Sequence, residues 1–128
     1  MIKLVVCMKK LPHLSQAEFL RFWLDEHGPI VRKNAAARRI KRYTQVHPDG
    51  AAALAGIVER RGGSVVTFDG LAEICWDSVD DIMAASKTAE GQRAAAEIVE
   101  HEKLFLDLPN LKFFLGKEHV FLDELTKA

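Results

Sequence analysis

The sequence predicts an α+β fold in which four strands form one antiparallel sheet and helices cover one face of that sheet. Three observations lead to this prediction. Four separate stretches have the residue pattern of a strand, and two of these stretches are followed by segments with helical apolar spacing. The 128 residues, of which 48% are hydrophobic and 28% charged, suit one compact domain spanning residues 1–128.

The chain begins with a predicted strand and a predicted helix. Residues 2–9 place apolar side chains on both sides of the middle of a strand. Ser15, with Glu18 three residues later, forms a capping box, which marks the start of a helix. The helical spacing of the apolar residues that follow extends this helix to about residue 26.

The second and third strands are predicted on either side of a loop. Residues 38–47 alternate as a strand, and residues 65–77 form another strand that is bent at residues 69–70. The Ala-rich stretch 48–63 between them is typical of a loop, with one or two helical turns around residues 54–60.

Two helices and a last strand complete the predicted order. A capped helix begins at Ser78 and runs to about residue 85, and a second helix runs from 88 or 89 to about 100. Residues 112–122 form the fourth strand, which Gly116 interrupts. The order βα, β, βα, β is a ferredoxin-like split βαβ arrangement, with both helices packed on one face of the sheet.

The opposite face of the predicted sheet has no helix to cover it. Strands 2–9, 65–77 and 112–122 carry apolar residues on both sides. An uncovered face of this kind would exceed the few hundred Å² of apolar patch that monomers tolerate. We therefore expect a homodimer that packs sheet on sheet.

Charge and motif content exclude several classes of function. Eighteen basic side chains balance eighteen acidic ones, so no overall field draws the chain to nucleic acid or to an anionic membrane. No apolar run approaches the ~20 residues that span a bilayer, and a cytoplasmic location is expected. The His and Cys residues lack metal-ligand spacing and no phosphate-cradling motif is present, so neither a metal nor an organic cofactor is expected.

Five segments of the chain carry a resemblance to a known family: IKLVVCMKK, FLRFWLDEHGPIVRK, RRIKRYTQVHP, FDGLAEICWDS and FFLGKEHVFLD. Taken in order, they resemble the EthD family of dimeric α/β-barrel proteins. The sharpest elements are W-x3-HGP at residues 23–29 and a DG-x-AE-x-W-like segment at residues 69–76. The resemblance covers nearly the whole chain apart from residues 49–67.

The resemblance implies a ferredoxin-like protomer, a homodimer in the form of a dimeric α/β barrel, and a pocket between the sheet and the helices of each subunit. Some members of the family are linked to ether degradation and some look like polyketide dehydratases. A related lactone isomerase moves protons without a cofactor. The family therefore fixes the fold more firmly than the reaction.

His27 is the first candidate for chemistry. Gly28 is expected to supply the left-handed residue that ends the first helix, and Pro29 to start a new short helix to about residue 37. A histidine held at such a break titrates near neutral pH and suits general acid or base catalysis, and the HGP motif of the resemblance coincides with it. The alternative is that His27 only complements the helix dipole.

Two predicted strands add further polar groups. Tyr43 and His47 lie on one face of the second strand, about 13 Å apart, where they either line one pocket or form an ordinary polar pair. Glu73 lies in an otherwise apolar strand. Burial of a carboxyl favours its protonated form, which would suit Glu73 to donate or accept a proton.

Three more residues are candidates for contact with a substrate. Cys75 shares its face with Glu73, and the isomerase relatives have a cysteine in a comparable strand, although a lone buried cysteine is usually an inert small hydrophobe. Trp23 and Trp76 can wall an aromatic substrate, but packing in the core is the favoured interpretation. The basic stretch 32–42 is interpreted as a solvated edge rather than as an anion site.

These residues together predict cofactor-independent acid–base catalysis, a dehydration or isomerisation of the lyase or isomerase type, on a small aromatic or polyketide-like molecule. His27 is the principal acid or base, and Glu73, Tyr43 and His47 orient the substrate or relay protons. Two alternatives stay open. A cofactor-free oxygenase would consume oxygen, and a non-catalytic accessory or ligand-binding dimer of a degradative oxidation system would bind without turnover.

Overall fold

Four strands form the centre of the molecule. The computed structural model describes residues 1–126 of the chain. The sheet has the order β2-β3-β1-β4, with every neighbouring pair antiparallel. This topology confirms the predicted α+β, ferredoxin-like arrangement. The strands are β1 (Ile2–Met8), β2 (Arg42–Val46), β3 (Gly70–Trp76) and β4 (Lys112–Lys117).

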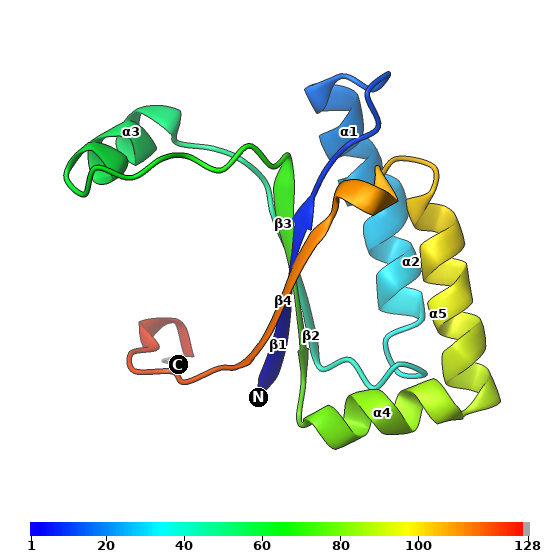
Figure 1. Cartoon of the computed structure of the whole chain (residues 1–128). Coiled ribbons are helices and arrows are strands. Elements are labelled where there is room, and N and C mark those ends of the chain that lie inside the picture. The colour runs from blue at the N-terminus through cyan, green and yellow to red at the C-terminus, as the bar shows by residue number, and fades with distance from the viewer. Residues whose placement is uncertain (127–128) are drawn as a thin grey trace.

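Helices cover one face of this sheet, and two segments project on the other side (Figure 1). The covering helices are α1 (Gln16–Phe22), the π-helical η1 (Trp23–His27), α2 (Gly28–Lys33), α4 (Val79–Lys87) and α5 (Ala89–Glu102). Two short 3₁₀ helices, η2 (Leu108–Asn110) and η3 (Glu124–Thr126), flank β4 in the sequence. The projecting segments are α3 (Ala51–Glu59) and the chain after β4.

The core lies between the sheet and the covering helices. Aromatic rings from α1, η1 and the chain after α5 meet there: the ring centroids of Phe19 and Trp23 lie 5.7 Å apart, and those of Phe19 and Phe105 also 5.7 Å. Burying a large apolar side chain of this kind contributes about 1.5–3 kcal/mol. The buried cluster consists of Val6, Met8, Phe19, Trp23, Ala72, Phe105, Leu106 and Leu111.

The strand register decides which residues face the helices and which face away. Val6 and Met8 belong to the core cluster, so the alternate positions of β1, among them Lys3, point to the opposite side, called here the open face. Lys3 pairs with Cys75, and Val5 with Glu73. Glu73 and Cys75 therefore share one face, as the sequence pattern predicted, and that face is the open one.

The first helix does not end at Gly28, which corrects the sequence prediction. Gly28 has a right-handed φ of −51°, and the helix continues through η1 into α2. The reason lies in Pro29, which has no N–H to continue the α-helical hydrogen bonds. The helix instead forms a π-helical turn, in which the Gly28 N–H donates to the Trp23 carbonyl five residues earlier rather than four.

All four strands are shorter than predicted, and the ends of the third and fourth strands lack a partner strand to pair with. The pairing of β1 spans only Ile2↔Trp76 to Met8↔Gly70 with β3, and reaches Lys117 in β4. Residues 65–69 and 118–122 thus extend beyond the strand that would pair with them. The second strand begins at residue 42 rather than 38, because Arg38 and Arg39 lie in a turn in which Arg39 has φ of 58°.

The helices in the second half are longer than predicted. The structure has a full helix α3 within the predicted loop 48–63. Helix α4 extends to Lys87 rather than to about residue 85, and α5 to Glu102 rather than to about residue 100. Within residues 1–126, no helix combines the length and the apolar character needed to cross a membrane.

Candidate functional site

A pair of histidines links η1 to α5. The Nδ1 atoms of His27 and His101 lie 2.9 Å apart, at hydrogen-bond distance, and the two rings stack with their centroids 5.1 Å apart. His27 is almost fully buried, with 2% of its surface exposed, whereas His101 is partly exposed. Phe22 stacks on His101 and Phe105 packs against His27. Apolar rings therefore hold both imidazoles in place.

The environment of the pair keeps His27 neutral. Burial first, and then the charge of His101, lowers the pKa of His27 to about 4. A hydrogen bond between two Nδ1 atoms needs one donor and one acceptor, so two neutral rings must be opposite tautomers. His27 is thus not a charged cap of a helix end, since it is neutral near pH 7 and the helix continues beyond it. The expectation that His27 itself titrates near neutral pH is wrong for the same reason.

A row of polar side chains lies on the helix-facing side of β2 and is centred on Gln45. This polar row consists of Tyr43, Gln45 and His47. The Gln45 amide nitrogen lies 2.9 Å from the Trp23 carbonyl oxygen and 2.9 Å from the Tyr43 hydroxyl. Because a carbonyl oxygen only accepts, this nitrogen is the NH₂ group and the Gln45 Oε1 faces His47, at 2.8 Å from its Nε2. His47 must then donate from Nε2, which leaves its Nδ1 as the free acceptor of the neutral ring.

Trp23 connects this polar row to the core. His47 stacks on the Trp23 ring, with the centroids 4.6 Å apart and the planes within 5°. The Trp23 indole nitrogen is buried beside the Tyr43 hydroxyl but has no hydrogen-bond partner of acceptable geometry within residues 1–126. Burial raises the pKa of Tyr43, and the side chains of Gln45 and Trp23 act in the opposite direction. Burial also lowers the pKa of His47.

Gly28 explains why the HGP motif suits this arrangement. A Cβ at Gly28 would lie 3.2 Å from the Gln45 amide nitrogen and 3.6 Å from the Trp23 carbonyl oxygen. The Trp23 carbonyl thus accepts two bonds, one from the Gly28 N–H of the π turn and one from Gln45. In the motif, the histidine side chain contacts α5, the glycine leaves room for Gln45, and Pro29 causes the π turn.

A half-buried pair of opposite charges lies on the same side of the sheet. Burial raises the pKa of Glu102 to about 7, against the opposing effect of Arg38. Burial in turn lowers the pKa of Arg38, against the effect of Glu102. The negative charge of Glu102 also acts to raise the pKa of Tyr43. Near pH 7 the Glu102 carboxyl is therefore present in both its protonated and its ionised form.

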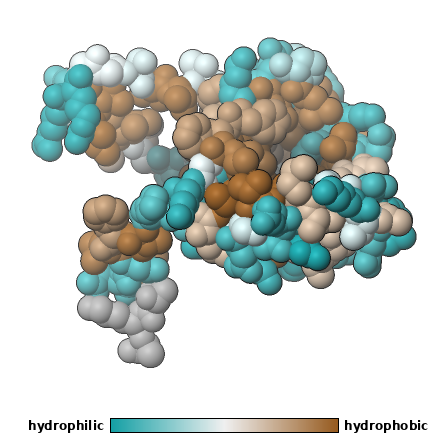
Figure 2. Space-filling view, turned by 60° about the horizontal axis from the view of Figure 1, so that its bottom comes forward, coloured by the Kyte–Doolittle hydropathy of each residue, from teal (hydrophilic) through white to brown (hydrophobic). Residues whose placement is uncertain are grey.

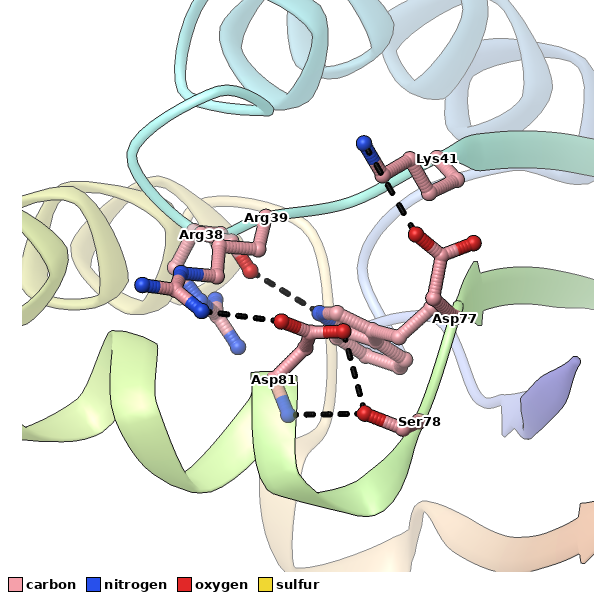
Figure 3. Close-up of polar contacts among 7 residues, drawn as sticks. Arg38, Arg39, Lys41, Asp77, Ser78 and Asp81 are labelled. Atoms are coloured by element: carbon pink, nitrogen blue, oxygen red, sulfur yellow. Dashed lines mark hydrogen bonds and ion pairs between the residues drawn. The ribbon is translucent and has the colours of Figure 1, made fainter.

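A network at the start of β2 fixes the turn that carries Arg38 (Figure 3). The Trp76 indole nitrogen donates to the Arg38 carbonyl oxygen at 2.9 Å. Arg39 bonds to Asp81 at 2.8 Å, and the Asp81 backbone N–H donates to the Ser78 hydroxyl that caps α4. Lys41 faces Asp77 at 3.9 Å. These contacts hold the basic turn against the N-terminus of α4.

A surface cleft of about 490 Å³ runs along the free edge of β2, beside η1 and α2. Tyr43 and Gln45 line it, so the polar row is reached from this side. Arg32, Lys41 and Arg42 form a rim with no acidic residue among the lining side chains. The His27 side chain does not line this cleft. The other lining residues are Leu24, Gly28, Ala35, Ile40 and Thr44.

Comparison with known proteins places this geometry in a family. A family model for the EthD domain matches residues 11–109. The chain belongs to the EthD family. The match includes both histidines of the pair, the HGP motif and the whole of β2, and it confirms the resemblance found in the sequence motifs.

Solved structures share the EthD fold. An ethyl tert-butyl ether d (EthD) family protein from Bacillus halodurans is 19% identical, with a TM-score of 0.59 over 93% of this chain and 99% of that chain. An EthD-like protein from Ralstonia eutropha is 17% identical, with a TM-score of 0.57 over 98% and 96%. A dimeric protein with a ferredoxin-like fold from Bacteroides fragilis is 11% identical, with a TM-score of 0.56 over 91% and 95%.

Two of the residues predicted for the site lie on the other side of the EthD sheet. Glu73 faces the open side and bonds to Lys3 at 2.9 Å, and Lys3 also pairs with Glu118. Cys75 lies below these side chains with 1% of its surface exposed, and burial raises the pKa of its thiol. The sheet therefore separates Glu73 and Cys75 from His27, and the structure does not bring them into one pocket.

The two tryptophans are packed in the interior of the EthD domain. Trp23 belongs to the core cluster, and Trp76 is buried with its indole nitrogen bonded to Arg38. Both positions agree with the favoured interpretation of core packing. No group of three or more metal-ligating side chains was found in residues 1–126. In the His27–His101 pair, the Nδ1 atoms face each other rather than a common metal position.

Sequence reasoning missed four residues that this geometry brings forward: His101, Gln45, Arg38 and Glu102. His101 carried a usable signal, because it continues the buried stripe of α5 through Gly91, Ala94 and Ile98 at helical spacing. Gln45 lay on the same predicted face as Tyr43 and His47. Nothing local marks Arg38 or Glu102, because their burial depends on how the turn after α2 packs against α5.

Proposed function

We propose that this EthD domain catalyses cofactor-independent acid–base chemistry, a dehydration or an isomerisation, on a small aromatic or polyketide-like molecule. The His27–His101 pair is the proton-handling group. The observation that carries the proposal is the 2.9 Å contact between the two Nδ1 atoms, one of which belongs to a buried ring with a lowered pKa. Such paired and perturbed groups gather at functional sites.

The two histidines have different roles in this proposal. His27 stays neutral and accepts a hydrogen bond from the His101 Nδ1–H, which fixes the tautomer of His101. The Nε2 lone pair of His101 is then the base that takes a proton from the substrate. The His27 lone pair stabilises the imidazolium that forms, and His101 later returns the proton as the acid. His101 is the more exposed ring, which favours it for this exchange.

Tyr43 and Gln45 orient the substrate in the proposal. The Tyr43 hydroxyl accepts from Gln45 and so keeps its own O–H as a donor toward a substrate oxygen. Both residues line the cleft along β2, which neither His27 nor His101 lines, so the substrate must reach from this cleft to the His101 ring. His47 holds the Gln45 amide in place through its Nε2.

A homodimer is the second part of the proposal. Two solved relatives of this fold, from Bacteroides fragilis and Thermobifida fusca, are described as dimeric. On the open face of this chain, Phe114 and Val46 are exposed, and Val5 and Leu71 lie between them on the paired strands. Packing two such faces together removes this apolar surface from water.

Deuterium exchange tests the acid–base proposal without knowledge of the net reaction. The protein is incubated in D₂O with a panel of aromatic and polyketide-like molecules that carry an acidic C–H, and NMR follows the loss of that proton. We expect exchange of at least one molecule, and a loss of about 10²-fold or more in His101→Gln and in His27→Gln. Exchange that is equally fast in both variants would contradict the proposal. Circular dichroism of the variants shows that they fold.

The cleft along β2 favours a second candidate, a ligand-binding dimer without turnover. Its cationic rim and the Tyr43 hydroxyl suit the carboxylate of a small aromatic acid. Titration with benzoate, followed by NMR shifts of the β2 amides, separates the two candidates when it is combined with the exchange experiment. Shifts without any exchange favour the binding function. Oxygen consumption in the same mixtures would instead favour the cofactor-free oxygenase.

A further inference from the structure

Two arms leave the open face of the sheet at opposite ends. The first is the α3 arm, residues 48–68, which joins the end of β2 to the start of β3 (Figure 1). The second is the C-terminal arm, residues 118–125, which follows β4. The register places the α3 arm at the end where Met8 pairs with Gly70, and the C-terminal arm at the end where Ile2 pairs with Lys117.

The α3 arm and the sheet enclose an apolar groove of about 630 Å³. Leu54 of α3 and Phe68 lie on the arm side, and Val46 and Leu71 lie on the sheet side. His47, which stacks on Trp23, lines the same groove. The remaining lining residues are Pro48, Asp49, Gly50, Ala51, Val65, Val66 and Gly70.

The C-terminal arm carries apolar side chains that no other residue within 1–126 covers. Phe121 is 99% exposed and Leu125 is 94% exposed, and Val120 and Leu122 are also exposed. Hydrophobic residues on both arms gather on the sides that face the hollow between them (Figure 2). Contiguous exposed apolar surface of this kind marks an interaction site.

A two-fold axis that runs across the strands brings the C-terminal arm of one copy close to the groove beside the α3 arm of the other copy. Such an axis, lying between two face-to-face sheets, places the C-terminal end of one sheet beside the α3 end of its partner. Stacked sheets lie about 10 Å apart. An extended segment as long as the C-terminal arm spans up to about 28 Å. The arm is therefore long enough to cross from its own sheet to the groove of a second copy.

We propose that the C-terminal arm of each protomer inserts Phe121 and Leu125 into the groove between the α3 arm and the sheet of its partner. The inference rests on the homodimer proposed above and adds the contact that determines its geometry. Because the contact is reciprocal, it closes after two copies and does not extend into a chain of molecules. The inserted arm also covers His47, so each polar row on β2 is completed by a residue of the other subunit.

Sedimentation equilibrium with matched variants tests whether the inserted arm strengthens the dimer. Phe121→Asp and Leu54→Asp place a charge on the arm and in the groove, respectively, and each is expected to weaken the dimer by about 30-fold or more. Leu104→Asp is the control, because Leu104 is an equally apolar exposed residue on the helix side of the molecule. A dimer that Phe121→Asp leaves unchanged, or that Leu104→Asp weakens as much, would overturn the inference.

A spin label shows whether the contact joins two chains. His119→Cys, in a background with Cys7→Ala and Cys75→Ala, carries a nitroxide on unlabelled protein, which is mixed with ¹⁵N-labelled protein that has no nitroxide. We expect broadening of the Leu54, Val66 and His47 amides in the labelled chain, since only an arm from the other chain can bring the nitroxide there.

Three other outcomes would each reject arm insertion or the homodimer itself. Broadening of these amides only when the nitroxide and ¹⁵N are on the same chain shows that the arm fills its own groove, and the inference is wrong. A dimer without any broadening at the groove rejects arm insertion but keeps the homodimer. Wild-type protein that sediments as a monomer at micromolar concentration rejects the homodimer itself.

Discussion

The Nδ1 atom of His27 lies 2.9 Å from the Nδ1 atom of His101, which stands 74 residues later in the chain. The contact joins the π turn η1 to helix α5 across the side of the core. Phe22 stacks on His101, and Phe105 packs against His27. Because His27 is buried, a protonated His27 ring would be poorly hydrated. This single contact has consequences for stability as well as for chemistry.

The first prediction concerns acid pH. The pKa of His27 is about 4 in the folded chain and 6.5 ordinarily, so the unfolded chain binds more protons between these values. Stability that His27 provides above pH 6.5 is lost as pH falls toward 4, by about 3 kcal/mol. Urea unfolding at fixed protein concentration should show this loss in wild type and not in His27→Gln. Parallel pH profiles of the two proteins would refute the burial argument.

The second prediction concerns Glu102 and has the opposite sign. Its pKa is about 7 in the folded chain and 4.5 ordinarily, so the folded chain binds more protons between these values. Glu102 therefore lowers stability as pH rises from 4.5 through 7, by about 3 kcal/mol at most. Glu102→Gln should be more stable than wild type at pH 8 and similar at pH 4. The His27→Gln variant is the matched control, because it removes a group whose contribution to the pH dependence has the opposite sign.

The sheet was predictable because its signals are local. Short apolar or alternating stretches located all four strands, and the capping box at Ser15 and Glu18 located the first helix, where both bonds of the box are present. The ends of strands were less predictable. Residues 118–122 contain an apolar run, as β4 does, but the pairing with β1 ends at Lys117, so β1 provides no partner for them.

The candidate site was predictable only in part, because its contacts join distant segments. The shared face of Tyr43 and His47 follows from strand spacing alone. His27 was identified by its motif, but its partner depends on the packing of η1 against α5. The shared face of Glu73 and Cys75 also follows from alternation, but only the strand register shows that this face is the one without helices.

The third prediction compares two glycines that lie in helices. Gly28→Ala places a methyl group 3.2 Å from the Gln45 amide nitrogen, whereas a Cβ at Gly56 in α3 meets nothing within 4 Å. Gly56→Ala should stabilise the chain by about 0.5–1 kcal/mol through helix propensity. Gly28→Ala should lose the Gln45 bonds and destabilise by about 1 kcal/mol.

Ultraviolet titration provides a second measurement for the same pair of variants. Tyr43 is the single tyrosine of the chain, so the phenolate absorbance reports on it alone. The Gln45 bond acts to lower the pKa of Tyr43, so its loss in Gly28→Ala should raise that pKa, while Gly56→Ala leaves it unchanged. An identical phenol titration in all three proteins would show that Gly28 does not control the position of Gln45.

The last prediction separates the two faces of the sheet. Glu73 bonds to Lys3 on the open face, and Lys3 keeps Glu118 as a second partner when Glu73 is changed. Because a partly exposed ion pair contributes about 0–1 kcal/mol, Glu73→Gln should fold normally. It should also leave deuterium exchange within about twofold of wild type, whereas His101→Gln loses about 10²-fold. If Glu73→Gln lost exchange to the same extent while it remained folded and dimeric, proton transfer would take place on the open face, and the His27–His101 pair would only join η1 to α5.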